Sequence, residues 1–348
     1  MNAITISEQG GPVAANIRCV SDWPDEQPPG AGEALVCTRA SALNHMDIWV
    51  GLGIPGVELD YPRVSGCDAC GVVEAVGDDV DPGWVGRTVV TNAAVDRSPP
   101  ARPGEPTAAD VAPEYILIGE HIHGMHRERF RAPVANLAVL PDDADPHAAA
   151  AFGLTSLTAY SMMVSKGRLR PGQWVLITGI GGGVATAALS IAKWMGCRAI
   201  VTSRSRAKLD RAIELGADDA VLDEGQDWSK DVRARTQKRG VDMAVDSVGA
   251  PTHLKCIKSL ARGGAFVTPG NTGGPKVETD QARIFWNQLR VLGSTMGTND
   301  EWREVTALFA AGKIAPVIDS VTPWRDAQRA WSRLEAADQL GKLVLSWE

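Results

Sequence analysis

Residues 174–186, Trp174-Val-Leu-Ile-Thr-Gly-Ile-Gly-Gly-Gly-Val-Ala-Thr186, decide the fold of this chain. The apolar run 175–177 predicts a parallel strand that is covered on both faces. Glycines follow, and they allow positive φ angles and a close approach of a pyrophosphate to the backbone. Apolar residues that recur every four positions from Val184 predict a helix to about Met195. Its first-turn N–H groups lack intrahelical partners, so Gly181, Gly182, Gly183 and Val184 are predicted to bind a dinucleotide, although G-x-G-x-x-G is imperfect here.

The end of the next predicted strand, at about residues 198–202, indicates which dinucleotide binds. Dinucleotide folds that use NAD place an Asp or Glu about 20 residues after the glycines. Here Ser203 and Arg204 occupy that place, and no acid follows until Asp210. Ser203 can donate to a 2′-phosphate and Arg204 can offer a charged fork, so we predict NADP(H). Lys208 is a further candidate, with the alternative that Arg206 and Lys208 are only the solvated face of the next helix.

Strands alternate with helices through the middle of the chain, which predicts a doubly wound, six-stranded parallel sheet of the Rossmann type. The predicted strands are 174–179, 198–202, 219–223, 241–246, 264–268 and about 288–294, and the predicted helices are 183–196, 206–215, 227–238 and 251–261.

The first 150 or so residues have a different pattern. Short apolar runs at 33–40, 71–76, 87–91 and 130–140 are separated by Pro, Gly and Asp, which favours an antiparallel or barrel-like β domain. Residues 98–113 are rich in proline and predict an exposed loop. The tail predicts helix 302–310, strand 316–321, helix 327–337 and strand 342–347, and is expected to return to the first domain.

The totals exclude several classes of protein. A length of 348 residues predicts two domains. A net charge of −7 without a basic cluster argues against nucleic-acid binding, and no apolar run approaches the roughly 20 residues of a membrane span. The start of the chain lacks a basic segment and an apolar signal core, which predicts a cytoplasmic location. Six sparse cysteines predict reduced thiols rather than a disulfide framework.

The ordered motifs of the chain resemble the medium-chain dehydrogenase/reductase superfamily, and its zinc-free quinone-reductase branch in particular. They are Ser41-Ala-Leu-Asn-His-Met-Asp-Ile-Trp49, Gly66-Cys-Asp-Ala-Cys-Gly71, Gly153-Leu-Thr-Ser-Leu-Thr158, the turn Gly179–Ala185, Asp246-Ser-Val-Gly249 and Gly341-Lys-Leu-Val-Leu345. The resemblance implies a discontinuous GroES-like catalytic domain, 1–152 and 298–348, with a Rossmann domain, 153–297, inserted. It also implies an active site in the cleft between them, and a homodimer (or a tetramer) formed through strand 288–296.

The resemblance places the three catalytic zinc positions at Asn44, Cys67 and about Leu154, of which Cys67 alone suits zinc. No cysteine lies between Cys70 and Cys197 for a structural zinc, so we predict no metal. Cys67-x-x-Cys70 lacks a second pair and is interpreted as two small buried residues. His121, His123 and His126 are interpreted as surface or loop residues.

The resemblance also assigns site roles, each with a structural alternative. Asn44 lies beside the nicotinamide and the reacting carbon, or is a turn residue. Thr158 contacts the nicotinamide, or caps a helix. His45 and Lys342 approach the pyrophosphate, or are a loop histidine and an exposed strand lysine. Trp49 lines the acceptor cleft, or is a core aromatic residue. Asp68 replaces the glutamate that lies near the zinc in zinc-containing members of the family. Asp47 makes a structural hydrogen bond. Further cofactor contacts are expected from Ser247, Val248, Gly270, Asn271, Ser294 and Met296.

These features together predict an NADPH-dependent, zinc-independent reductase that transfers hydride to a quinone or an α,β-unsaturated carbonyl compound. The tyrosine of the family's enoyl-thioester reductases is missing near Ile54-Pro55. Without a general acid, protonation from water suits an enone or quinone better than alcohol oxidation, which needs a strong base. The alternatives are an alcohol or aldehyde dehydrogenase of the same superfamily and a non-catalytic NADPH-binding protein.

Overall fold

A computed structural model describes residues 1–98 and 111–348 of the chain and divides it into two compact units. Unit 1 comprises Met1–Leu154, Thr298–Gly312 and Val317–Glu348, and unit 2 comprises Thr155–Gly297 and Lys313–Pro316. The sequence placed the boundaries after residues 152 and 297 and assigned the short segment 313–316 to the first domain. Most of the predicted proline-rich loop 98–113 lies outside the described residues.

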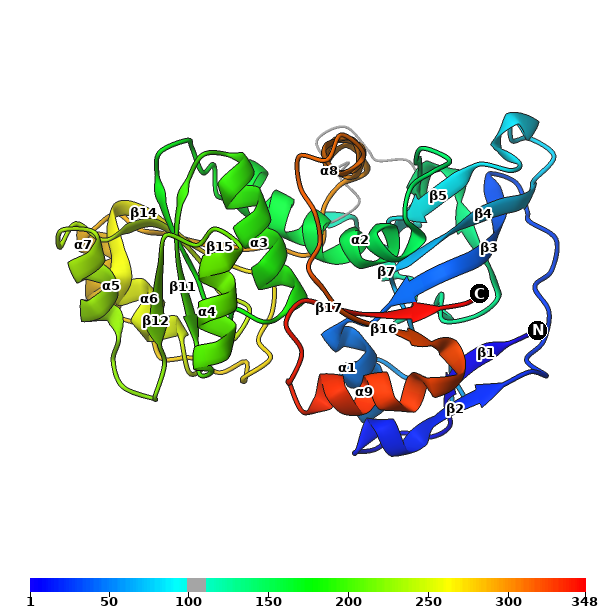
Figure 1. The fold of residues 1–348 in the computed structure, drawn as a ribbon, viewed down its shortest axis with the longest axis horizontal. Helices are drawn as coiled ribbons and strands as arrows, with labels where there is room; N and C mark the ends of the chain where they lie inside the picture. Colours follow the sequence, from blue (N-terminus) through cyan, green and yellow to red (C-terminus); the bar gives the residue numbers. More distant parts are fainter. Residues whose placement is uncertain (99–110) are drawn as a thin grey trace. The chain divides into compact units, whose positions relative to one another are not determined.

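Unit 2 is built on a six-stranded parallel sheet in the order β12-β11-β10-β13-β14-β15 (Figure 1). The strand order reverses at β10, where the chain crosses from the β11 side to the β13 side, and such a point opens a crevice at the carboxyl ends of the strands. The predicted Rossmann-type sheet is therefore confirmed. The strands are β10 (Trp174–Ile177), β11 (Arg198–Ser203), β12 (Asp219–Leu222), β13 (Val241–Val245), β14 (Leu260–Thr268) and β15 (Arg290–Gly293).

Helices pack on this sheet and bury its apolar side chains. Leu176, Ile200 and Phe266 of the strands pack with Trp228 and Ile257, and all five are almost inaccessible to solvent. Burial on this scale contributes roughly 1.5–3 kcal/mol for each large apolar side chain. The helices are α3 (Gly183–Trp194), α4 (Arg206–Glu214), α5 (Ser229–Arg235), α6 (His253–Ser259) and α7 (Gln281–Trp286).

Unit 1 contains a seven-stranded, mainly antiparallel sheet in the order β16-β17-β3-β4-β5-β9, with β8 also paired to β3. The predicted GroES-like β-rich domain is confirmed. The predicted run 130–140 is two strands, because a turn at Val134–Asn136 follows Pro133 and sends β8 to β3 and β9 to β5. The strands are β3 (Glu33–Ala42), β4 (Ala69–Val76), β5 (Thr88–Thr91), β8 (Arg129–Pro133), β9 (Leu137–Val139), β16 (Ile318–Pro323) and β17 (Lys342–Ser346).

Several elements of unit 1 have no counterpart in the sequence predictions. Two antiparallel pairs are formed by β1 (Ala3–Ile6) with β2 (Ile17–Val20) and by β6 (Ala94–Asp96) with β7 (Tyr115–Leu117). A short helix, α1 (His45–Leu52), follows β3 directly. The tail helices are close to prediction, with α8 at Asn299–Ala310 and α9 at Ala327–Glu335.

Helix α2 (Pro146–Tyr160) runs into a π-helical turn at Ser161–Lys166, and its backbone is kinked at Gly153. Together these residues form a 21-residue helix that is long and apolar enough to cross a membrane by length and composition alone. Within the described part of the chain it is the one helix with this property. Because 78% of its apolar window is buried inside the protein, it has the burial of a core helix.

Candidate active site

The glycine turn predicted to hold phosphates connects β10 to α3. Gly179 and Gly181 have φ angles of +62° and +134°, which L side chains rarely adopt. A Cβ atom on Gly179 would come within 2.9 Å of the Val248 side chain. Helix α3 begins at Gly183, and no side chain caps its N-terminus. Its first N–H groups, which include that of Val184, are therefore left for an anion such as a pyrophosphate.

The predicted selector for the 2′-phosphate lies at the carboxyl end of β11. Ser203 is buried, and its Oγ accepts a hydrogen bond from the Ser205 N–H at 3.1 Å, which leaves its own O–H to donate. Arg204 is exposed and lines a cavity of about 570 Å³. Lys208, whose N–H donates to the Ser205 Oγ, does not line that cavity. The remaining lining residues are Asp223, Glu224, Gly225, Pro251 and Lys255.

The cavity is lined by both positive and negative side chains. Arg204 is the lining cation that can bind an anion, because the other one, Lys255, is paired with a carboxylate. Lys255 Nζ lies 2.9 Å from the Asp223 carboxylate, so these two charges offset each other. Burial would raise the pKa of Asp223, but hydrogen bonds from Trp228 and Lys255 hold it below its ordinary value. Glu224, which is exposed, remains the carboxylate that opposes an anion here.

Residues predicted to contact the cofactor after β13 and after β14 lie together in unit 2. The Thr272 N–H donates to the Ser247 carbonyl at 3.2 Å, and the Gly273 N–H donates to the Val248 carbonyl at 2.7 Å. Asp246, which is fully buried, organises the first loop, because it accepts from the Thr178 hydroxyl at 2.5 Å and the Thr252 hydroxyl at 2.8 Å. Gly270 and Asn271 belong to the second loop and are half-buried and exposed.

Thr158, Ser294 and Met296 are also brought together in unit 2. The Thr158 hydroxyl faces the Met296 sulfur at 3.9 Å, and Lys166 Nζ donates to the Ser294 Oγ at 3.3 Å. Met296 has a left-handed φ of +48°, and all three predicted residues are buried. Thr158 lies in α2 after the kink at Gly153.

In unit 1 the predicted residue Asn44 is the centre of a buried polar cluster. It stands between β3 and α1, and its backbone N–H donates to the Asp47 carboxylate at 2.7 Å, as predicted for a structural aspartate. Its side-chain Nδ2 donates to Asp68 Oδ2 at 2.8 Å and to Cys67 Sγ at 3.2 Å. Its Oδ1 accepts from Lys342 Nζ at 2.6 Å. The four side chains of Asn44, Cys67, Asp68 and Lys342 form what we term the Asn44 cluster.

The carboxylate of Asp68 joins this cluster to the kink in α2. Its Oδ1 accepts the Leu154 N–H at 2.6 Å, and its Oδ2 accepts from both Asn44 and Lys342. The irregular backbone of Gly153 frees that N–H from the helix, and a Cβ on Gly153 would lie 2.1 Å from Asp68 Oδ1. Glycine is therefore required there so that the carboxylate can approach the helix backbone.

Lys342 begins β17 and is 3% exposed, so the alternative of an exposed strand lysine is wrong. Its ammonium lies 2.8 Å from Asp68 in a buried ion pair. Sequence reasoning predicted Asn44, Asp68 and Lys342 as separate site residues and did not predict that they bind one another. The three lie far apart in the sequence, and no local pattern links them; the β17–β3 pairing brings them together.

The residues present do not fit a catalytic zinc. Cys67 is the one cysteine of the cluster, and burial, together with the nearby charge of Asp68, raises the pKa of its thiol well above its ordinary value. Asn44 and the backbone of Leu154 take the other expected positions, and an ammonium already occupies the cluster. Within residues 1–98 and 111–348 no group of three or more His, Cys, Asp or Glu could hold a metal ion. We derive no catalytic step through zinc.

Three other predicted residues surround the start of α1. His45 and Trp49 are half-buried with their rings edge to face at 5.2 Å, and burial lowers the pKa of His45. His126 lies in a loop, as expected, but it is fully buried and is not a surface residue. His126 lies 3.4 Å from the Asp47 carboxylate and 2.9 Å from the Ser41 hydroxyl. Because Asp47 accepts the backbone N–H of Asn44, this histidine helps to hold the carboxylate that positions Asn44.

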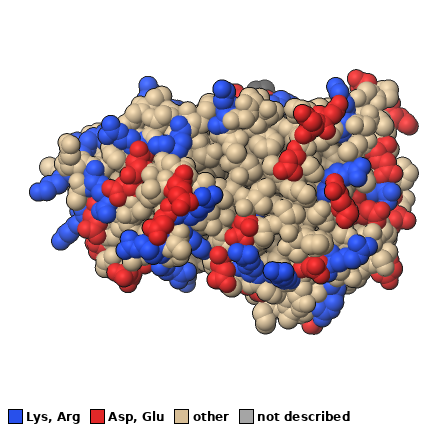
Figure 2. Space-filling view, in the orientation of Figure 1, with Lys and Arg blue, Asp and Glu red and all other residues tan. Residues whose placement is uncertain are grey.

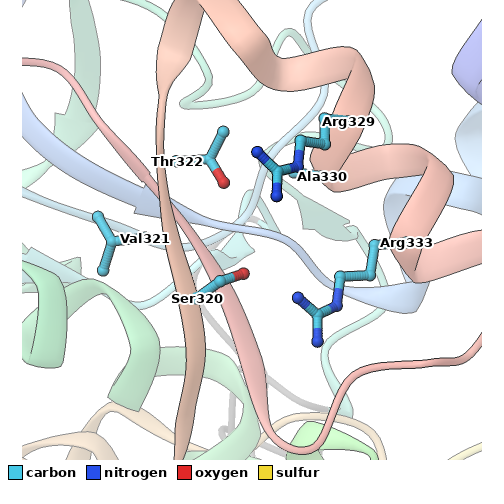
Figure 3. Close-up of a pocket in the computed structure, with 6 residues that line it drawn as sticks. All are labelled: Ser320, Val321, Thr322, Arg329, Ala330 and Arg333. Atoms are coloured by element: carbon cyan, nitrogen blue, oxygen red, sulfur yellow. The ribbon is translucent and has the colours of Figure 1, made fainter.

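The surface of unit 1 also has a small cavity of about 80 Å³ between β16 and α9, lined by Ser320, Thr322, Arg329 and Arg333 among others (Figure 3). Arg333 is paired there with Asp319 at 3.0 Å. Figure 2 shows acidic and basic side chains interspersed over the face in view. This cavity contains none of the predicted site residues.

Fold and site together define a two-unit, dinucleotide-binding oxidoreductase, and comparisons with known proteins identify its family. An alcohol dehydrogenase GroES-like domain matches residues 30–142, and a zinc-binding dehydrogenase domain matches residues 183–311. The crystal structure of an NAD-dependent alcohol dehydrogenase is 36% identical, with a TM-score of 0.91 and full coverage of both chains. The chain therefore belongs to the medium-chain dehydrogenase/reductase superfamily, as the sequence motifs indicated.

Other relatives are named after different activities. A zinc-type alcohol dehydrogenase-like protein of Leptosphaeria maculans is 29% identical over 336 residues, 91% of each chain. An acryloyl-coenzyme A reductase of Sulfurisphaera tokodaii is 26% identical over 344 residues, 94% of this chain and 95% of its own. The structure of a mycobacterial protein, Rv1454c, in complex with NADPH is 28% identical, with a TM-score of 0.82 and coverage of 99% and 100%.

Proposed function

We propose that this protein is an NADPH-dependent, zinc-independent reductase of α,β-unsaturated carbonyl compounds or quinones. The observation that carries the proposal is the Asn44 cluster, where an ion pair between Lys342 and Asp68 occupies the place at which the sequence resemblance puts a catalytic zinc. NADPH, when bound, supplies a hydride from C4 of its nicotinamide. The chain supplies the glycine cradle, the Ser203–Arg204 selector and the polar groups of the cluster.

The preference for NADPH is supported by charge at the end of β11. No carboxylate stands at Ser203 or Arg204, and Arg204 projects into a cavity large enough for part of a nucleotide. The NADPH complex of the mycobacterial relative agrees with this choice. The relative named as NAD-dependent shows that the opposite choice also occurs in this fold, so the two cofactors must be compared directly.

The type of acceptor is supported by the composition of the Asn44 cluster, which offers no group to accept the proton of an alcohol. Alcohol oxidation needs a group that accepts the hydroxyl proton, usually beside a metal ion. Here Cys67 is protonated, and the Asp68 carboxylate is already bound by three donors. Reduction of an activated C=C bond or a quinone requires only stabilisation of developing negative charge, and the name of the acryloyl-coenzyme A reductase is consistent with this.

Oxidation of NADPH and of NADH should be compared across quinones, enones, enoyl-coenzyme A thioesters and aldehydes, with metal analysis of the same sample. We expect turnover with at least one enone, enoyl thioester or quinone, a higher kcat/KM for NADPH, and no stoichiometric zinc. Turnover restricted to alcohols and aldehydes, with stoichiometric zinc, would support the alcohol dehydrogenase alternative. Tight NADPH binding without turnover would support a non-catalytic protein.

We also propose that the protein forms a homodimer through β15, the outer strand of the unit 2 sheet. Edge strands with unpaired backbone groups favour pairing with another strand. Beside β15, Phe285 and Trp286 are 65% and 70% exposed. Sedimentation or light scattering of the full chain would show a monomer if this proposal is wrong. A cytoplasmic location, and the absence of nucleic-acid and membrane partners, stay predictions.

A further inference from the structure

The hydrogen bonds of the Asn44 cluster leave one N–H of the Lys342 ammonium without an acceptor among the described residues. Both N–H groups of Asn44 are used, one on Asp68 and one on Cys67, and the Leu154 N–H is used on Asp68. The Lys342 ammonium has three N–H donors, and residues in the described part of the chain accept two of them, through Asn44 Oδ1 and Asp68 Oδ2. Since buried donors are almost always paired, the third N–H needs an explanation.

We propose that Lys342 is a catalytic residue whose third N–H donates to the carbonyl oxygen of the acceptor. This inference rests on the proposed function, because it requires an acceptor with such an oxygen. Asp68 and Asn44 are then positioning residues that hold the ammonium. Reduction of an enone adds hydride to the β-carbon, moves the C=C electron pair toward the carbonyl and puts negative charge on its oxygen. The enolate then takes a proton at the α-carbon from water, and Lys342 keeps its own proton.

The orientation of the Asn44 amide supports this assignment. Its carbonyl oxygen faces the ammonium and its NH₂ group faces the carboxylate. The flipped amide would set NH₂ against the ammonium and oxygen against the carboxylate, and both contacts are repulsive. Asn44 is therefore locked with its donors turned inward. It has no N–H left for an acceptor oxygen, so within the Asn44 cluster the Lys342 ammonium is the one remaining N–H donor.

The position of the ammonium also favours the acceptor over the cofactor pyrophosphate. Its Nζ lies 2.6 Å from Asn44 Oδ1. The ammonium is therefore in direct contact with the residue that the family resemblance places beside the reacting carbon. A buried ammonium needs a fixed counter-charge, which Asp68 supplies at 2.8 Å. A donor that is held in place before the reaction stabilises a developing oxyanion without reorganisation, typically by 10²–10³-fold in kcat.

The test compares two variants of the full-length protein. Lys342→Met/Asp68→Asn removes both charges, which avoids leaving a lone buried carboxylate that could unfold the protein. The matched control, Asp68→Asn, keeps the ammonium and an acceptor oxygen beside it. Activity is measured with NADPH and the best enone or quinone from the screen, and NADPH affinity is measured separately by the quenching of protein fluorescence. Melting temperatures check that both variants are folded.

We expect the double variant to have a kcat about 10²–10³-fold below that of Asp68→Asn, with NADPH dissociation constants within twofold of each other. Equal kcat values would overturn the inference and leave the proposed function standing. A tenfold weaker NADPH affinity with kcat preserved would also overturn it, because Lys342 would then bind the pyrophosphate. Absence of turnover by the unaltered protein with every acceptor would reject the proposed function, and with it this role for Lys342.

Discussion

Replacement of Gly153 by alanine should disrupt the site through the backbone alone. The new Cβ would lie 2.1 Å from Asp68 Oδ1 and 3.1 Å from Asp68 Cγ, where ordinary contacts begin near 3.4 Å. Either α2 or the carboxylate must move by more than 1 Å, which breaks the 2.6 Å hydrogen bond from the Leu154 N–H. A hydrogen bond to a charged group contributes roughly 1.5–3 kcal/mol, and overpacking costs roughly 1–3 kcal/mol more. The free energy of unfolding of unit 1 should therefore fall by about 2.5–6 kcal/mol.

Differential scanning calorimetry checks this value. At roughly 2–4 °C per kcal/mol for a unit of this size, the transition of unit 1 should fall by about 5–24 °C. Gly30→Ala, also in unit 1, is the matched control, since its Cβ would make an ordinary contact of 3.4 Å with the flexible Glu33 side chain and its φ is not left-handed. That variant should melt within about 3 °C of the unaltered protein, because a compatible alanine changes stability by less than about 1 kcal/mol. If Gly153→Ala also melts within that range, the close approach of Asp68 to the helix does not exist in solution.

Three further predictions follow from cofactor choice, thiol chemistry and pH. Arg204→Asp should weaken NADPH binding by about tenfold or more and leave NADH binding unchanged, whereas Arg206→Asp, outside the cavity, should affect neither; equal losses for both cofactors would show that Arg204 is not the selector. The raised pKa of Cys67 predicts that iodoacetamide at about pH 8 labels the exposed Cys19 first and reaches Cys67 only after denaturation; rapid labelling of Cys67 in the folded protein would contradict its burial. Burial would raise the pKa of Asp47, but nearby His126 and its hydrogen bonds hold it below its ordinary value. Its stabilisation is therefore present above about pH 4 and is lost as the pH falls further, so Asp47→Asn should flatten the acid limb of a plot of melting temperature against pH; an unchanged slope would refute the shift.

The sequence predicted unit 2 well because its signals are local. A run of apolar residues such as 175–177, a glycine turn and a helix of four-residue period each follow from a few neighbouring residues. Prediction was weaker in unit 1. Residues 130–140 are one apolar run in the sequence, but the turn after Pro133 divides them into β8 and β9, which pair with different strands. That choice depends on partners about 40 to 100 residues away along the chain and leaves no local pattern.

The same distinction applies to the site. The candidate residues Asn44, Asp68, Thr158 and Lys342 were recognised one motif at a time. Their mutual contacts could not be predicted, since a lysine that follows a glycine near the end of the chain gives no indication of the carboxylate it will meet. The burial of His126 was missed for a related reason, because its partner Asp47 lies on a helix that the sequence did not predict.

The ion pair between Lys342 and Asp68 has a consequence for synthesis of the protein on the ribosome. The two residues are 274 positions apart, and all of unit 2 up to Gly297 is made between them. At elongation rates of about 5–20 residues per second, roughly 14–55 s pass between the synthesis of Asp68 and that of Lys342. Late in that interval both segments of unit 2 have been made, whereas unit 1 still lacks β17 and the charge that balances its buried carboxylate. The Asn44 cluster therefore assembles only after Lys342 has been made, and stalling before Lys342 should yield a folded dinucleotide domain attached to an unfinished one.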